Sequence, residues 1–187
     1  MGLVDIMLSR PNLVILGLAV LAAIGGGWLQ HESRIAHVPP GVDVANVGDL
    51  RPDLVLTGLD GKPHHLSEFH GQRVLINFWA SWCVPCLAEM PALNTAQHNF
   101  ADQGAIVLGI AMDDPEHVRS FLNAHPVDYP ILIGQLNEPS TSLSLGDTDE
   151  VLPFSVLLDA SGRIVARRRG PLEPSQLSQW LSPGTAP

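Results

Sequence analysis

The feature that most constrains the fold of this 187-residue chain is an apolar segment that ends next to its only two cysteines. Residues 74–79 read VLINFW, a run that is typical of a strand buried on both faces of a sheet. Cys83 and Cys86 follow, and from there to about residue 100 the apolar residues recur at helical spacing. The sequence therefore predicts a central strand that leads directly into a helix with both cysteines at its start.

The rest of the chain alternates between strand and helix patterns. Residues 105–112 and 129–134 read as buried strands, and a helix capped by Asp113 or Asp114 lies between them. The remaining predicted elements are hairpins within 53–69 and 155–168 and a last helix around Trp180. A chain of this length can bury one good core. We therefore expect an α/β domain with a mixed central sheet flanked by helices.

The first part of the chain has a different character. Residues 12–29 carry no charge and, as a helix, would span about 27 Å, close to the hydrocarbon thickness of a bilayer. Arg10 precedes this run, which favours a cytoplasmic location for residues 1–11. We expect a transmembrane anchor here, with a cleaved signal peptide as the alternative. Residues 30–45 then form a linker to an exported domain over 46–183.

The charge balance argues against one class of partner. Ten Lys and Arg residues against nineteen Asp and Glu residues give a net charge of -9, and the acidic residues are spread along the chain. Because such a surface repels polyphosphates, we expect no nucleic-acid partner for this protein.

The position of the cysteines predicts thiol–disulfide exchange. At a helix N-terminus, free N–H groups and the positive end of the helix dipole lower the pKa of the Cys83 thiol, which makes it the attacking thiolate. Cys86 lies one turn later, close enough for a disulfide, and resolves the mixed disulfide. Pro85 restricts the turn between them without losing a hydrogen bond. We expect a redox-active Cys83–Cys86 disulfide and no other cofactor.

Two other interpretations of the cysteine pair are weaker. A purely structural bridge across so short a loop would remove little chain entropy. A structural zinc site needs four ligands, and the chain contains no second CxxC motif. His64, His65 and His70 could complete a soft-metal site, although histidines are scattered along the whole chain. A redox function therefore explains the pair better than a structural bridge or a metal site.

Residues 77–91, NFWASWCVPCLAEMP, resemble the thioredoxin-like superfamily, and within it the membrane-anchored, exported TlpA/ResA-type branch. The likeness rests on the strand before the CxxC motif, on Trp82 beside the first cysteine, on Pro85 between the two, and on Pro91 after them. It extends from residue 48 to the last helix, and GDLRPD and LDGK are similar to an extra N-terminal β-hairpin of this branch. The resemblance implies a thioredoxin-like fold with that hairpin.

The resemblance also implies which residues face a substrate. Pro153, in EVLPFSVLLD, matches the cis-proline that faces the dithiol and pairs with the substrate backbone in this family. Leu152 before it offers an apolar contact. We therefore place Trp82, Pro85 and Leu152 in the substrate-binding surface, and Trp79 in the core.

Glu89 matches an acidic residue that this branch carries three positions after the second cysteine. One turn beyond Cys86, its carboxyl could tune thiol ionisation or pass a proton during resolution, with a solvated carboxylate as the alternative. Asn77 occupies the strand position of a buried aspartate in thioredoxin. Because an amide cannot exchange a proton at physiological pH, Glu89 becomes more important.

The function that the resemblance implies is the reduction of specific protein disulfides, such as those of apocytochrome c or of copper-centre assembly proteins. The protein would be a single-pass monomer of the bacterial inner membrane with its catalytic domain in the periplasm, kept reduced by a transmembrane thiol electron donor. A membrane tether would raise its effective concentration near such partners. A disulfide-donating oxidase and a Cu(I) chaperone are the alternatives. A thiol peroxidase is disfavoured, because Ile76 and Ala80 stand where such enzymes have Pro and Thr.

Overall fold

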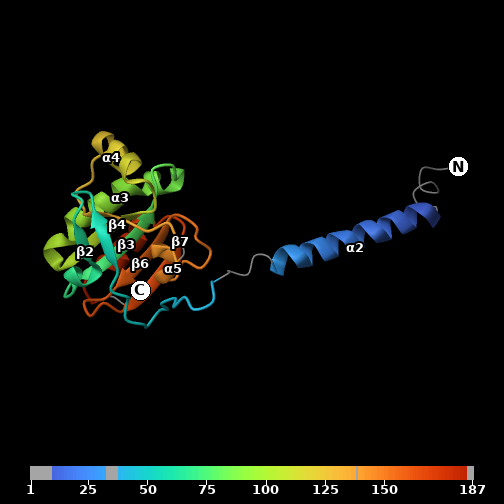
Figure 1. Cartoon of the computed structure of the whole chain (residues 1–187), viewed down its shortest axis with the longest axis horizontal. Coiled ribbons are helices and arrows are strands. Elements are labelled where there is room, and N and C mark those ends of the chain that lie inside the picture. Colours follow the sequence, from blue (N-terminus) through green and yellow to red (C-terminus); the bar gives the residue numbers. More distant parts are fainter. Residues whose placement is uncertain (1–9, 33–37, 138, 185–187) are drawn as a thin grey trace. The chain divides into compact units, whose positions relative to one another are not determined.

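A computed structural model describes residues 10–32, 38–137 and 139–184. The chain divides into two compact units, Met1–His37 and Val38–Pro187. In the described part of the first unit there is one helix, α2 (Arg10–Glu32), and the strands all belong to the second unit (Figure 1).

The anchor predicted over residues 12–29 falls within α2, which continues past the predicted start of the linker at residue 30. Searched over the residues that the structure describes, no helix is both long enough and apolar enough to cross a membrane. Residues 1–9 of the predicted cytoplasmic segment and residues 33–37 of the predicted linker lie outside the described residues.

The second unit is built on a mixed sheet of seven strands, in the order β2-β1-β5-β4-β3-β6-β7. The strands are β1 (Val55–Gly58), β2 (Pro63–His65), β3 (Arg73–Trp79), β4 (Ala105–Ala111), β5 (Ile131–Ile133), β6 (Phe154–Leu158) and β7 (Ile164–Arg169). β3, β4 and β5 run parallel, whereas β1 is antiparallel to β2 and β5, and β6 to β3 and β7. The predicted mixed α/β sheet is therefore confirmed.

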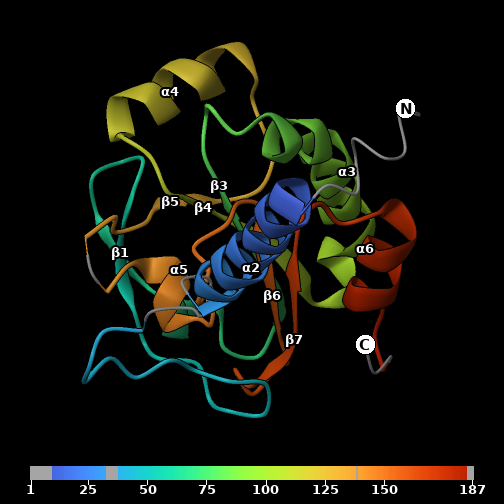
Figure 2. The ribbon, with the colours of Figure 1, turned by 90° about the vertical axis from the view of Figure 1, so that its right-hand side faces the viewer.

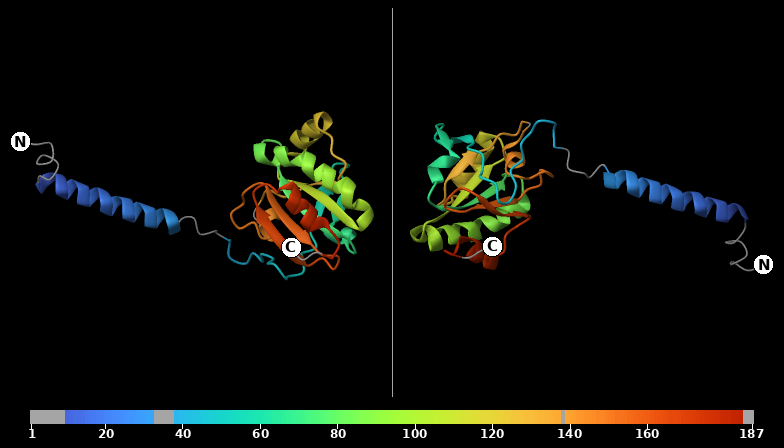
Figure 3. Two further views of the ribbon diagram at one scale, coloured as in Figure 1. Left: turned by 180° about the vertical axis from the view of Figure 1, so that it is seen from behind. Right: turned by 90° about the horizontal axis from the view of Figure 1, so that it is seen from below.

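Helices cover this sheet. They are α3 (Val84–Phe100), α4 (Pro115–Ala124), α5 (Thr141–Ser144) and α6 (Pro174–Leu181), with 3₁₀ turns η1 (Leu66–Phe69) and η2 (Ala101–Gln103). α3 and α6 lie side by side, as Figures 2 and 3 show. Leu93 of α3, Val118 of α4 and Leu177 of α6 belong to one core cluster, which covers one face of the sheet.

β3 lies near the middle of the sheet because both of its faces are apolar. Leu75 and Trp79 point into the cluster beneath α3, α4 and α6, whereas Val74, Ile76 and Phe78 point into the cluster on the opposite face. A strand with this pattern can be buried only between two covering layers. The C-terminal end of β3, where the cysteines follow, is thereby held between two apolar layers near the middle of the sheet.

α4 begins at a side-chain cap that the sequence predicts. Asp114 is its N-cap residue, and the Oδ1 atom accepts a hydrogen bond from the N–H of Glu116 at 2.8 Å. Pro115 occupies the first turn, where its missing N–H costs nothing. Of the two aspartates that could have capped this helix, Asp114 does so.

Replacing this cap is expected to lower stability. Asp114→Ala leaves the N–H of Glu116 without its side-chain acceptor, so the free energy of unfolding should fall by about 1 kcal/mol. Asp114→Asn keeps an acceptor oxygen, so its free energy of unfolding should fall by a smaller amount. Urea unfolding of the two variants and the parent protein measures the difference, and equal losses for both variants would contradict the capping role.

Candidate active site

The cysteines lie where the central strand leads into α3. β3 ends at Trp79, and Cys83 is the N-cap residue of α3. The N–H of Cys83 donates to the carbonyl oxygen of Ala80 at 3.1 Å, which closes the turn formed by residues 80–83, the cysteine loop. Cys83 and Cys86 form a disulfide with their Cα atoms 5.3 Å apart. The structure thus places the pair where the sequence predicts, at the start of a helix.

Cys83 is the more accessible of the two cysteines, but it is not freely exposed. Cys83 is 5% exposed and Cys86 is 0% exposed. Both cysteines are therefore largely covered in this disulfide form, because the sulfur of Cys83 is bonded to the buried sulfur of Cys86. Its neighbours Trp82 and Val84 are 68% and 76% exposed, so a partner that contacts them reaches the edge of the disulfide.

Asp113, which lies two residues after the end of β4, holds the cysteine loop in place. Its Oδ2 atom accepts hydrogen bonds from the N–H of Ser81, at 2.8 Å, and from the hydroxyl of Ser81. Burial opposes the ionisation of Asp113, but the hydrogen bonds from Ser81 and from the N–H of Asp114 prevail and lower its pKa. An ionised Asp113 therefore ties the residues after β4 to the loop that precedes Cys83.

Glu89 is buried on the inner side of α3. It is 5% exposed, so the alternative of a solvated carboxylate is wrong. Its Oε1 accepts from the side-chain amide of Asn77 on β3 and its Oε2 accepts from the N–H of Leu172, each at 2.8 Å. Burial raises the pKa of Glu89, although these two hydrogen bonds act in the opposite direction.

This arrangement puts a titratable group one helical turn beyond the buried cysteine. Glu89 lies one helical turn beyond Cys86, and both are buried. Because its raised pKa brings its ionisation closer to the pH range in which thiols titrate, the carboxylate is suited to accept a proton from Cys86. Asn77, which cannot transfer a proton, instead orients this carboxyl group.

Residues 146–153, the Pro153 loop, approach the cysteine loop from β6. The Leu152–Pro153 peptide bond is cis, as the resemblance implies. β6 is antiparallel to β3 and pairs Phe154 with Phe78, so Pro153 lies at the end of the sheet where the cysteines follow β3. The carbonyl oxygen of Pro153 accepts from the N–H of Gly170 at 2.8 Å, which secures the loop to the chain after β7.

A groove of about 480 Å³ opens between these two loops and the segment after β5. Its lining residues are Trp82, Met112, Leu136, Ser140, Ser142, Glu150, Val151 and Leu152. The structure therefore brings together Trp82 and Leu152, which the sequence assigns to the substrate surface. Pro85 is exposed in the first turn of α3, outside this lining. Glu150 and Val151 were not predicted from the sequence, although they directly precede Leu152.

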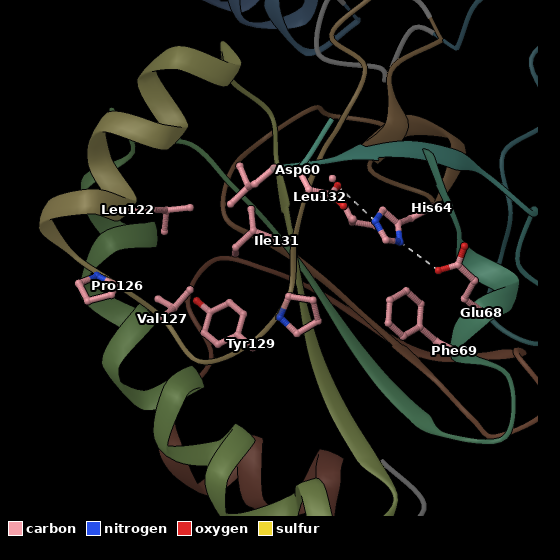
Figure 4. Close-up of a pocket in the computed structure, with 13 residues that line it drawn as sticks. Asp60, His64, Glu68, Phe69, Leu122, Pro126, Val127, Tyr129, Ile131 and Leu132 are labelled. Carbon is pink, nitrogen blue, oxygen red and sulfur yellow. Dashed lines mark hydrogen bonds and ion pairs between the residues drawn. The ribbon is translucent and has the colours of Figure 1, made fainter. Parts of the chain in front are cut away.

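A second cavity, of about 620 Å³, lies away from both loops, near the β1–β2 turn and the end of α4 (Figure 4). Tyr129 and Ile131 line it, and His64 lies between two carboxylates at its edge. The Nδ1 of His64 is 3.0 Å from Glu68 Oε2, and its Nε2 is 3.7 Å from Asp60 Oδ1. The hydrogen bond with Glu68 raises the pKa of His64. Among the described residues, no group of three or more His, Cys, Asp or Glu side chains could hold a metal ion.

A thioredoxin-like sheet with a disulfide-bonded CxxC pair at the start of a helix defines a thiol–disulfide oxidoreductase. The family model named Redoxin matches residues 46–181. The chain belongs to this family and, within it, to the thioredoxin-like proteins of ResA/TlpA type.

Known relatives agree with this assignment. The chain is 30% identical over 136 residues to thiol-disulfide oxidoreductase ResA of Geobacillus thermodenitrificans, covering 72% of this chain and 76% of the relative. It is 27% identical over 170 residues to ResA of Bacillus cereus, covering 90% of each. The crystal structure of a secreted thiol-disulfide isomerase from Corynebacterium glutamicum matches with a TM-score of 0.65 at 25% identity, over 79% of this chain and 94% of that one.

Proposed function

We propose that this protein reduces disulfide bonds in specific partner proteins. The thiolate of Cys83 attacks one sulfur of the partner disulfide, forms a mixed disulfide and releases the first partner thiolate. The thiolate of Cys86 then attacks the sulfur of Cys83, releases the second partner thiolate and closes the Cys83–Cys86 disulfide, so that two electrons pass to the partner. The observation that carries the proposal is this pair at the start of α3, with Cys83 directly after Trp82, which lines the groove, and with Cys86 fully buried.

The surroundings of Cys86 support a reductase over a disulfide-donating oxidase. Full burial disfavours the thiolate of Cys86, and an ionised Glu89 one turn away disfavours it further. Both effects oppose the stabilisation that the start of α3 gives to the thiolate of Cys83. Strong oxidants of this kind owe their potential to a stabilised reduced form. A dithiol with one destabilised thiolate gives up its electrons more readily.

The direction of electron flow is tested by the reduction potential. Equilibration of the purified protein with glutathione buffers is expected to give a reduction potential of about -220 mV or lower, in the range of thioredoxin and the glutaredoxins. A value near about -120 mV, typical of a strong oxidant, would rule out the reductase and favour the oxidase.

We also propose where this reduction occurs. The uncharged run over residues 12–29 supports a tether that holds the domain outside the cytoplasm, where a membrane thiol carrier would reduce it and where apocytochrome c or copper-centre assembly proteins would be its substrates. Alkaline phosphatase fused after residue 45 should be active in intact bacteria and should sediment with membranes. An inactive fusion would contradict this location.

A further inference from the structure

The groove beside the cysteine loop combines exposed apolar side chains with a single charge. Trp82, Leu136 and Val151 are 68%, 59% and 50% exposed although they are large and apolar. Glu150 is the one charged residue among the groove's lining residues. Its carboxylate has no hydrogen bond or ion pair with any residue that the structure describes. A surface of this kind is suited to an apolar group with a positive charge next to it.

The backbone at Glu150 has an unusual conformation. Among the described residues other than glycine, only Glu150 has a positive φ, of 49°. This left-handed region is unfavourable for a residue with a Cβ atom, and such residues occur preferentially at sites that clamp a ligand. The conformation therefore favours a function for this side chain over an accidental surface position.

Contacts of the neighbouring residues fix the backbone position of Glu150. Its N–H donates to the carbonyl oxygen of Asp147 at 3.1 Å. Asp147 is 0% exposed, and its Oδ1 lies 3.5 Å from the Nε of Arg169 on β7. Arg169 also donates from Nη2 to the hydroxyl of Thr148 at 3.0 Å. Because an ion pair between the buried Asp147 and the partly exposed Arg169 anchors the Pro153 loop to the sheet, the carboxylate of Glu150 is presented on a pre-organised support, which reduces the entropy lost on binding.

We infer that Glu150 selects partner segments in which an aliphatic residue lies beside the reacting cysteine and a lysine or arginine follows it. The aliphatic side chain lies in the groove against Trp82 and Leu152, and the cation pairs with Glu150. Trp82, which directly precedes Cys83, lines this groove, so a segment whose cysteine is bonded to Cys83 is held next to it. The inference therefore rests on the proposed disulfide exchange and adds to it the chemistry of the preferred substrate.

Symmetric peptides test this selection without assuming the direction in which the segment binds. The probes are capped Lys-Leu-Cys-Leu-Lys, Gln-Leu-Cys-Leu-Gln, Glu-Leu-Cys-Leu-Glu and Lys-Gly-Cys-Gly-Lys, each as a mixed disulfide with thionitrobenzoate. The thiolate of Cys83 attacks the peptide sulfur and expels coloured thionitrobenzoate, and Cys86 then releases the peptide thiol. For the reduced full-length protein, kcat/KM should be about threefold higher for the Lys-Leu-Cys-Leu-Lys peptide than for the Gln-Leu-Cys-Leu-Gln peptide. It should be about tenfold higher for the Lys-Leu-Cys-Leu-Lys peptide than for the Lys-Gly-Cys-Gly-Lys peptide.

Matched variants distinguish the effect of Glu150 from a general attraction between the lysine peptides and this acidic protein. Glu150→Gln should remove the preference for lysine over glutamine, and Glu150→Lys should reverse the order of the lysine and glutamate peptides. Asp102→Asn, which loses the same charge at the far end of α3, should keep the parent order. Rates with dithiothreitol correct for the intrinsic reactivity of each peptide.

The outcomes distinguish this inference from the proposed function. If no peptide reacts with the reduced protein, disulfide exchange itself fails, and the inference fails with it. If all four react at one rate, or if Glu150→Gln keeps the parent order, the exchange stands and the selection by Glu150 is wrong. Reversal of the order by Glu150→Lys supports the selection directly.

Discussion

Cys86→Ser is expected to remain covalently joined to its partner through Cys83, whereas Cys83→Ser should reduce insulin more than about a thousandfold more slowly than the parent protein. The difference follows from position. Cys83 lies at the start of α3 between the exposed residues Trp82 and Val84, where it can attack, whereas Cys86 is fully buried and can reach only the sulfur of Cys83. Without that second thiolate, the mixed disulfide has no resolving group and accumulates.

The adducts are visible as bands on non-reducing gels of cells that produce the full-length variants, and mass spectrometry identifies the partners. A variant in which both cysteines are serine is the matched control and should show no adduct. If Cys83→Ser formed the adducts instead, with Cys86 as the attacking residue, the assigned order of the two thiols would be wrong.

Those features of the site that depend on local sequence could be predicted. A continuous apolar strand, a turn and helical periodicity determine where Cys83 lies, so its position at the start of α3 follows from residues close to it in the chain. The turn between β6 and β7 is also local, because the N–H of Gly162 donates to the carbonyl oxygen of Asp159 at 2.9 Å. In contrast, β5 is shorter than the predicted 129–134, since Pro130 has no N–H to pair in the sheet.

Features that depend on contacts between distant residues could not be predicted. Glu89 accepts from the N–H of Leu172, which is 83 residues away, and no sequence pattern marks a backbone donor. Leu136 joins the groove from a segment without periodicity, so only the tertiary fold brings it to Leu152. The low exposure of Cys83 likewise depends on how the whole loop packs, which no local pattern in the sequence indicates.

A second large effect is expected when Glu89 is replaced, on the step in which Cys86 resolves the mixed disulfide. Glu89→Gln removes the carboxylate that can accept the proton of Cys86, so resolution should slow by about a hundredfold near neutral pH. The loss should shrink as the pH rises, because hydroxide then ionises the thiol without help. Attack by Cys83 should change little, since Glu89 is buried one helical turn beyond Cys86 and is not at the surface.

The same substitution has a predictable effect on stability. Burial raises the pKa of Glu89 above its ordinary value of 4.5, so the folded protein holds this proton more tightly than the unfolded chain. The resulting stabilisation is fully present below that value and is lost as the pH rises through the folded-state pKa. Glu89→Gln should remove this pH dependence from the free energy of unfolding. It should also lower stability at every pH, because its amide nitrogen faces the N–H of Leu172 or the amide of Asn77.

Kinetics separate the proton transfer from this general destabilisation. The symmetric disulfide of thionitrobenzoate releases one coloured thiolate when Cys83 attacks and a second when Cys86 resolves, so one stopped-flow trace reports both steps. Glu89→Gln should slow only the second release and should change its pH profile. Glu116→Gln, an exposed carboxylate on α4 paired with Arg119, is the matched control and should leave both phases unchanged. A uniform slowing of both releases by Glu89→Gln, with the parent pH profile, would show that Glu89 only supports the fold.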